Sequence, residues 1–255
     1  MPVELVTIPC LSDNYSFLIH DDETGETAVV DVPDAAPIKA ALEKRGWVLS
    51  HVLLTHHHWD HIDGLSDLAA DHPAAVFGAA ADAHRLPPLD QELADGDTFQ
   101  FGAETVHVMD VSGHTNGHIA FHMPDSKLLF TADSLMALGC GRLFEGTPEQ
   151  MHASLSKLAA LDPETTVCSG HEYTQSNGKF ALTVDPDNPQ LISRVQAVAE
   201  ARAAGQPTVP STLAEELETN PFLRGHTPGV QKAVNMVGAD PVQVFAEVRK
   251  RKDNF

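Results

Sequence analysis

The chain has 255 residues, enough for one large domain or for a large domain with a smaller one. Its formal net charge of −20 repels polyanions, so we expect no nucleic-acid partner. No apolar run approaches the roughly 18 residues of a membrane helix, and Met1 to Cys10 lacks the pattern of a signal peptide. We therefore expect no membrane partner.

The cysteines exclude two further classes of protein. Cys10, Cys140 and Cys168 are odd in number, far apart in the chain and without a Cys-x-x-Cys pair. This spacing argues against a disulfide framework and against a zinc site made of thiolates. We expect a monomeric protein of the reducing cytoplasm.

The chain begins with a predicted β-meander. Short β-prone runs are separated by turn residues and lie at 3–8, 15–19 and 27–30. An amphipathic pattern at 37–45, closed by Gly46, predicts a helix. Asp31 follows the third run. Either its carboxylate orients a metal ligand, or Asp31 is an ordinary turn residue.

A stretch rich in histidine follows an apolar strand at Val52–Leu54. In extended backbone, residues two apart face the same way, so His56 and His58 can bind one metal while His57 points elsewhere. Such an imidazole pair is typical ligand chemistry for a divalent cation.

Asp60 and His61 form a second pair. Asp60 lies just before a predicted helix at 62–70, where open N–H groups and the helix dipole favour an anion. Because the two pairs point to slightly different places, the stretch predicts two metals rather than one.

Thr55-His56-His57-His58-Trp59-Asp60-His61 resembles the metal-binding signature of the metallo-β-lactamase superfamily, and in particular its glyoxalase II branch, the hydroxyacylglutathione hydrolases. Alternating strands and helices favour two sheets covered by helices, and helical patterns take over from residue 173. The resemblance implies an α/β fold, a four-layer αββα sandwich with a small helical C-terminal domain. We expect a catalytic domain over 1–172 and an α-helical substrate-binding domain over 173–255.

Three later residues resemble the remaining ligands of this family. His114 lies in a turn between glycines that resembles the family element Gly-His-Thr-x-Gly-His, which leaves His118 a structural or ligand-orienting role. Asp133 resembles the bridging aspartate, although Ala132 stands where glycine is common. His171 follows a further strand and a glycine.

The resemblance implies a dinuclear centre with open coordination. One metal would be held by His56, His58 and His114, the second by Asp60, His61 and His171, with Asp133 bridging. Nitrogen and oxygen donors suit two zinc ions, with iron or manganese as alternatives. His107 and His122 lie on predicted strands and are expected to be structural.

Further segments resemble the family's glutathione contacts. These are a loop with Arg142 and Phe144, Tyr173 after the last ligand, and the C-terminal Arg249, Lys252 and Asp253-Asn254-Phe255. The segment Asn220–Arg224 also resembles the family. A negatively charged protein needs such local cations to bind the carboxylates of a glutathione thioester.

The implied reaction is hydrolysis of S-lactoylglutathione, a 2-hydroxyacyl thioester, to glutathione and D-lactate, which detoxifies methylglyoxal. A hydroxide bridging the two metals would attack the thioester carbonyl, oriented by Asp60, while Asp133 bridges the metals. The alternative is a mononuclear iron persulfide dioxygenase of the same superfamily. A nucleic-acid processing enzyme and a non-enzymatic metal-binding module fit the charge and the open coordination less well.

Overall fold

The computed structural model describes residues 3–255, so Met1 and Pro2, with which the expected catalytic domain begins, lie outside it. The chain forms two compact units. Unit 1 contains the residues up to 111 together with 116–131, and unit 2 contains 112–115 and 132–255. Within residues 3–255 no helix is long and apolar enough to cross a lipid bilayer.

Unit 1 contains a mixed sheet in the strand order β1-β2-β3-β4-β5-β6. Its strands are β1 (Glu4–Cys10), β2 (Asn14–His20), β3 (Thr27–Val30), β4 (His51–Leu53), β5 (Ala75–Ala79) and β6 (Gln91–Leu93). The first three strands pair antiparallel, as the predicted meander requires, and β3 to β6 pair in parallel. The ends of β3 and β4 therefore lie at the same edge of the sheet.

A second run of strands in unit 1 is antiparallel throughout. It consists of β7 (Thr98–Phe101), β8 (Glu104–Asp110), β9 (Ile119–Met123) and β10 (Leu128–Ala132), whose last residue begins unit 2. The ring centroids of Phe17 on β2 and Phe130 on β10 are 5.8 Å apart, and those of Phe77 and Phe99 are 5.0 Å apart. Aromatic side chains of the two sheets thus meet in a common core.

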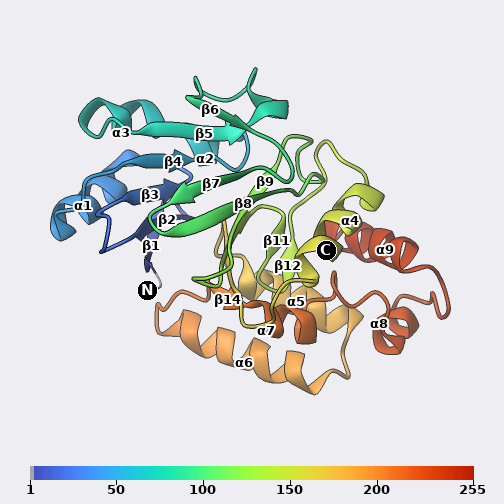
Figure 1. The fold of residues 1–255 in the computed structure, drawn as a ribbon. Coiled ribbons are helices and arrows are strands. Elements are labelled where there is room, and N and C mark those ends of the chain that lie inside the picture. The colour runs from blue at the N-terminus through green and yellow to red at the C-terminus, as the bar shows by residue number, and fades with distance from the viewer. Residues whose placement is uncertain (1–2) are drawn as a thin grey trace. The chain divides into compact units, whose positions relative to one another are not determined.

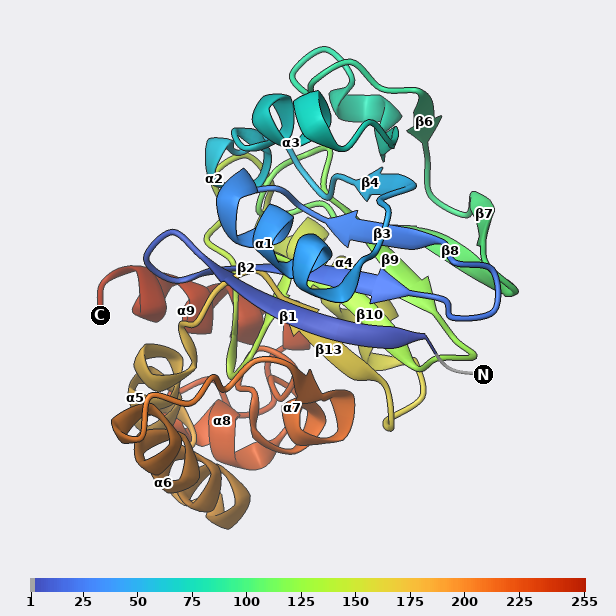
Figure 2. The ribbon, with the colours of Figure 1, turned by 90° about the vertical axis from the view of Figure 1, so that its left-hand side faces the viewer.

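The other face of the mixed sheet is covered by helices, as Figures 1 and 2 show for α1 (Ala35–Arg45) and α3 (Leu65–Asp71). Asp34 caps α1, and Gly46 ends it with φ of 68°, which agrees with the predicted stop. Ile38, Leu42 and Leu68 are fully buried beneath these helices.

The predicted helix at 62–70 is instead two short helices, α2 (Trp59–Ile62) and α3. The break arises because the backbone bonds to Val32: Val32 N–H donates to His61 O at 2.7 Å, and Gly64 N–H donates to Val32 O at 2.9 Å. The His61 carbonyl thus accepts from Val32, whereas in a continuous helix it would accept from the N–H group four residues later. A 3₁₀ turn, η1 (Ala80–Asp82), follows β5.

Unit 2 is mainly helical. Its elements are β11 (Leu135–Met136), β12 (Gly139–Cys140), α4 (Pro148–Ala159), β13 (Thr166–Ser169), α5 (Thr174–Val184), α6 (Pro189–Ala203), β14 (Ser211–Thr212), α7 (Leu213–Thr219), α8 (Pro228–Ala233) and α9 (Pro241–Asp253). Helices α5 and α6 lie side by side, and α4 packs on α9 (Figure 1).

One sequence expectation for unit 2 needs adjustment, and one departure from the family pattern is explained. Strand structure does not disappear after residue 173, because the short strand β14 pairs antiparallel with β13. Ala132, which stands where the family commonly has glycine, has φ of 40°. This left-handed conformation is the one that glycine adopts without steric cost, so the structure explains the family's preference.

We predict that Gly64→Ala destabilises the protein by about 1–3 kcal/mol, because overpacking a filled site costs this much. A Cβ atom at Gly64 would lie 2.8 Å from Ala35 N and 2.9 Å from Val32 O, and backbone cannot yield as a side chain does. Urea denaturation measures the change. Ser66→Ala, at an exposed position in the adjacent α3, is the control and should leave the midpoint nearly unchanged.

Candidate metal centre

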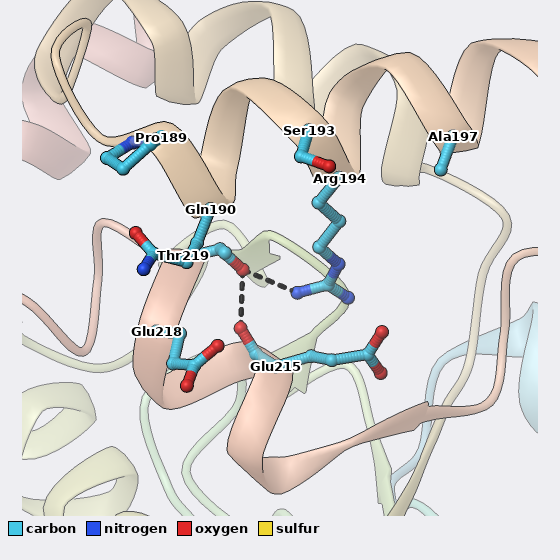
Figure 3. Close-up of a pocket in the computed structure, with 8 residues that line it drawn as sticks. All are labelled: Pro189, Gln190, Ser193, Arg194, Ala197, Glu215, Glu218 and Thr219. Carbon is cyan, nitrogen blue, oxygen red and sulfur yellow. Dashed lines mark hydrogen bonds between the residues drawn. The ribbon is translucent and has the colours of Figure 1, made fainter.

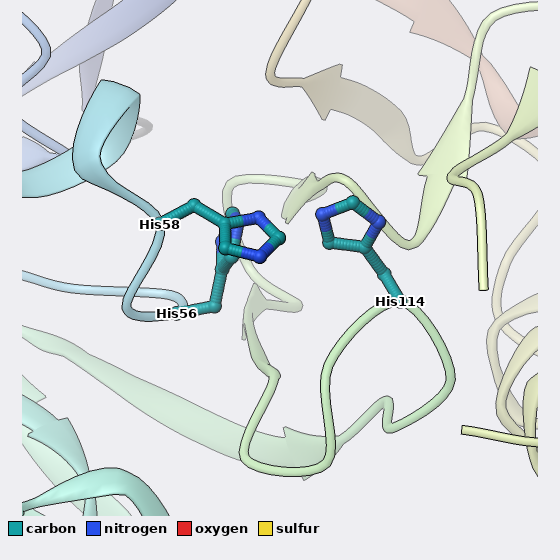
Figure 4. Close-up of side chains that lie close together, drawn as sticks. All are labelled: His56, His58 and His114. Atoms are coloured by element: carbon teal, nitrogen blue, oxygen red, sulfur yellow. The ribbon is translucent and has the colours of Figure 1, made fainter. Parts of the chain in front are cut away.

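The loop after β4 brings two of the predicted ligands together. His56 is fully buried, and its Nε2 lies 3.2 Å from Nδ1 of His58. Figure 4 shows both imidazole rings on this loop and His114 on a separate turn. The expectation that residues two apart share a direction therefore holds for His56 and His58.

His57, between them, points elsewhere as expected. Its Nδ1 lies 2.9 Å from Oδ2 of Asp82, a carboxylate that is 1% exposed as a residue. The other oxygen of Asp82 accepts from Arg85 Nε at 3.0 Å. A buried carboxylate with both oxygens bound fixes the side chain of His57 and therefore the backbone between the two ligands.

The contacts of Asp31 agree with one of the two roles that the sequence left open, the orientation of a predicted metal ligand. Its Oδ2 lies 2.8 Å from Nδ1 of the buried His61, and the same oxygen accepts from Thr55 Oγ at 2.8 Å. One carboxylate O of Asp31 and ring nitrogens of His56 and His61 lie within 4.8 Å of one another. Because Asp31 Oδ2 already accepts these hydrogen bonds, it orients His61 and directs Nε2 of this ring away from itself.

Asp60 lies near a helix N-terminus as predicted, but within the first turn of α2, which begins at Trp59, rather than before a helix at 62–70. Its Oδ2 accepts from Asn14 Nδ2 at 3.1 Å, and its backbone carbonyl accepts from the same amide at 3.0 Å. Oδ2 of Asp60 also lies 3.9 Å from Nε2 of His61. The sequence showed Asn14 merely as a turn residue, because nothing in its local pattern indicates a partner 46 positions further along the chain.

Unit 2 brings together the other three predicted ligands. Oδ2 of Asp133 lies 3.5 Å from Nε2 of His114 and 3.3 Å from Nε2 of His171. Gly170 N–H donates to Ala132 O at 3.0 Å, which places the residues that follow each of them side by side. All three side chains are almost fully buried.

The donors in each unit fit divalent metals by chemistry and by spacing. Two ligand atoms about 2.1 Å from one metal are roughly 3.0–3.4 Å apart in octahedral or tetrahedral geometry. The spacings His56–His58, His114–Asp133 and His171–Asp133 agree with this to within about 0.1 Å, whereas the Asp60–His61 spacing of 3.9 Å is about 0.5 Å wider than this range.

The ring orientations support the same conclusion. Nδ1 of His114 lies 2.7 Å from the carbonyl oxygen of Arg142, and Nδ1 of His61 is bound by Asp31. An imidazole that donates from Nδ1 presents the lone pair of Nε2, the arrangement in which proteins bind metals. The cysteines are buried and free, and burial raises the pKa of the Cys140 thiol to about 11, so thiolate ligation is not indicated.

Two of the predicted substrate contacts share one carboxylate in unit 2. Arg142, whose side chain is 60% exposed, has Nε 3.7 Å from Oδ1 of Asp253. Arg249 donates from Nη2 to the same oxygen at 2.7 Å and from Nη1 to Cys140 O at 3.0 Å. Arg249 is 6% exposed, so it is built into the fold, whereas Arg142 is open to solvent.

The other three predicted contacts carry aromatic or cationic groups. Tyr173 stacks on His171 with ring centroids 4.6 Å apart, and Phe144 makes an edge contact with His114 at 5.3 Å. Lys252 Nζ lies 5.3 Å from the ring of Phe180. Burial lowers the pKa of Lys252, and the charge of nearby Arg249 lowers it further.

The remaining histidines of the sequence analysis have structural contacts. His118 is buried and stacks on the ring of His56, with centroids 4.6 Å apart, so it packs against a predicted ligand. His107 and His122 face each other across β8 and β9, with ring centroids 6.3 Å apart. These positions are consistent with the structural role expected for both histidines.

Comparison with known proteins places the chain in a class. Residues 12–171 match the model described as the metallo-beta-lactamase superfamily, and residues 172–255 match the hydroxyacylglutathione hydrolase C-terminus. The chain is therefore a member of the metallo-β-lactamase superfamily. The crystal structure of the BLEG-1 B3 metallo-beta-lactamase, 20% identical, has a TM-score of 0.67 and covers 86% of this chain and 99% of its own, which confirms the predicted fold class.

Close relatives narrow the class to one family. A hydroxyacylglutathione hydrolase of Jannaschia sp. is 66% identical and covers 99% of this chain and 98% of its own length. Another, of Ruegeria pomeroyi, is 64% identical over the full length of both chains. The chain belongs to the hydroxyacylglutathione hydrolase family, and the resemblance noted in the sequence is confirmed.

We predict that Asp31→Asn weakens metal binding by about 10–100-fold, the usual effect of removing a carboxylate that orients a ligand histidine. Asp31 accepts at both carboxylate oxygens, from Thr55 N–H at Oδ1 and from Thr55 Oγ and His61 Nδ1 at Oδ2, whereas an asparagine has one accepting oxygen and would point its NH₂ group at a donor. Competition with a chelator, followed by metal analysis, measures the change. Asp63→Asn, exposed at the end of α2, is the control, and equal metal retention in the two variants would contradict the role of Asp31.

Proposed function

We propose that this protein is a hydrolase that converts S-lactoylglutathione to glutathione and D-lactate, a step of methylglyoxal detoxification. The observation that carries the proposal is the 66% identity to a hydroxyacylglutathione hydrolase over 99% of this chain. All seven predicted ligands lie in the present chain. The relatives support a persulfide dioxygenase less well.

The proposed centre contains the seven ligands that the family resemblance implies. One metal would be bound by His56, His58 and His114 and the other by Asp60, His61 and His171, with Asp133 between them. The match of one superfamily model to residues 12–171, which include all seven, supports this grouping. The donors suit zinc, with iron or manganese as alternatives.

When bound, two divalent cations supply Lewis acidity, which lowers the pKa of water towards neutrality and stabilises negative charge at a carbonyl oxygen. Asp60, whose carboxylate is fixed by Asn14, would orient the attacking water. The leaving group is a thiolate with a conjugate acid of pKa roughly 8.5, so its departure needs little help from a general acid. The absence of a dedicated acid from the proposed set is therefore compatible with the reaction.

The glutathione part of the substrate would bind to residues of unit 2. We assign Arg142 and Lys252 to its carboxylates, Phe144 and Tyr173 to the peptide, and Arg249 to the same site. We also propose the division into a catalytic domain over 1–172 and a substrate-binding domain over 173–255, a monomer, and a cytoplasmic location without membrane or nucleic-acid partners.

We predict that purified protein hydrolyses S-lactoylglutathione and contains two metals, and that Asp133→Ala loses metal and lowers kcat at least about 100-fold. Loss of thioester absorbance follows the reaction, and elemental analysis counts the metals. Incubation with a persulfide, with oxygen uptake followed at an oxygen electrode, tests the alternative persulfide dioxygenase activity. Oxygen consumption without thioester hydrolysis would overturn the proposed function.

We predict that Arg142→Ala and Lys252→Ala raise KM for glutathione thioesters about 5–50-fold and change kcat little, because their contacts are similar in the ground and transition states. Lys250→Ala is the matched control, since the Lys250 side chain is 76% exposed and lies near Glu247. Unchanged KM in the Arg142→Ala, Lys252→Ala double variant would remove both residues from the site.

A further inference from the structure

The hairpin β11–β12 lies between two residues of the proposed site in the sequence. Asp133 precedes its first strand, and Arg142 follows its second. In the hairpin Leu135 lies opposite Cys140 and Met136 opposite Gly139, and Gly141 N–H donates to Ser134 O at 3.1 Å. Its geometry therefore determines where the backbone at Asp133 lies relative to the backbone at Arg142.

The turn of this hairpin combines a strained residue with buried backbone polar groups. Leu138 has φ of 57°, a conformation that costs energy in any residue other than glycine. Residues 136–139 are all buried, so backbone polar groups of this turn that have no partner within the hairpin need one from elsewhere in the protein.

Buried side chains from the helical part of unit 2 supply these partners. Asn220 donates from Nδ2 to Met136 O at 3.1 Å and to Gly139 O at 2.9 Å. Glu216 accepts from Leu138 N–H at 2.9 Å. Asn177 donates to Ala137 O at 3.1 Å. We call Asn177, Glu216 and Asn220 the hairpin clamp.

Glu216 is fixed from several sides. It is fully buried, and besides Leu138 it accepts from Ser211 Oγ at 2.7 Å and Arg194 Nη2 at 2.5 Å, while its Oε2 lies 3.0 Å from Asn220 Nδ2. Arg194 lines a groove of about 500 Å³ between α6 and α7, where Figure 3 shows it bonded to Thr219. A buried carboxylate with this many donors has essentially one position, so it can hold Leu138 in one position as well.

The clamp reaches the proposed metal ligands through the hairpin. The carbonyl of Arg142 binds Nδ1 of His114, and Nε2 of that ring lies 3.5 Å from Asp133 Oδ2. A shift of the hairpin would move the carbonyl that orients one ligand relative to the carboxylate that is another. The backbone of Gly141 has little freedom to move towards the His114 ring, since a Cβ atom at this position would lie 3.0 Å from His114 Nδ1.

We infer that Asn220 and Glu216 are positioning residues of the metal centre, which act by clamping the β11–β12 turn. The inference rests on the proposed function for the identity of the ligands. It gives the C-terminal helical segment a second task besides substrate binding, namely to fix the distance between Asp133 and His114.

The test compares two buried asparagines of unit 2. Asn220→Ala removes both bonds to the hairpin. Asn188→Ala, the matched control, removes bonds of similar length to Asp185 and Glu218 O without touching the hairpin. We expect Asn220→Ala to weaken metal binding about tenfold or more in chelator competition, in the way that removing outer contacts of metal ligands does. Asn188→Ala should bind metal like the parent protein.

Two outcomes would overturn the inference. One is equal metal affinity in both variants, and the other is unchanged amide hydrogen exchange of the hairpin in Asn220→Ala relative to Asn188→Ala. The exchange measurement also covers the case in which Asn220→Ala retains too little metal for titration. Neither readout uses thioester hydrolysis, so a parent protein that binds metal but leaves S-lactoylglutathione intact would refute the proposed function and not the clamp.

Discussion

The chemistry proposed for this protein depends on how the Nδ1 atoms of its buried histidines are held. Asp31 binds Nδ1 of His61, the Arg142 carbonyl binds Nδ1 of His114, and Thr55 Oγ lies 3.1 Å from Nδ1 of His56. Each bond sets a ring orientation and leaves Nε2 as the donor atom for a cation. Without these oxygen atoms, a group of buried imidazoles would be costly and would have no defined direction.

The fold supplies these oxygen atoms at strand ends. Asp31 and Thr55 follow the parallel strands β3 and β4, and Asp31 N–H donates to Leu53 O at 3.0 Å. Parallel pairing brings the carboxyl ends of strands to one edge, so residues 24 positions apart become neighbours. Asp133 and His171 likewise each follow a strand by one or two residues.

Local pattern was sufficient for part of this site and insufficient for the rest. The shared direction of His56 and His58, the departure of His57 and the place of Asp60 at a helix start follow from backbone periodicity, which a sequence displays. The partners Asn14, Asp82 and Arg142 O could not be predicted in this way, since each bond joins residues 25 to 46 positions apart. The family resemblance, rather than spacing, indicated Asp133.

The fold was predictable to a similar depth. Strands with β-prone runs and helices with caps were found close to their observed bounds, as with α1 and its Gly46 end. The continuous helix at 62–70 was wrong because a tertiary bond to Val32 overrides local propensity. Helices α4, α5 and α8 were not predicted, although Thr147 and Gln150 form a capping box at the start of α4 that the sequence could have revealed.

In the proposed site, Arg142 would link substrate binding to metal binding within one residue. Its side chain is exposed and lies near Asp253, while its carbonyl orients His114. Arg249 is too buried to act freely, and by bonding Cys140 O and Asp253 it fixes the backbone before Arg142 and a carboxylate beside it. In a chain with a net charge of −20, the exposed guanidinium of Arg142 would give an anionic peptide a local cation that the overall field does not provide. The loop that would attract the substrate is therefore also the loop that orients His114. A shift of this loop would change both contacts.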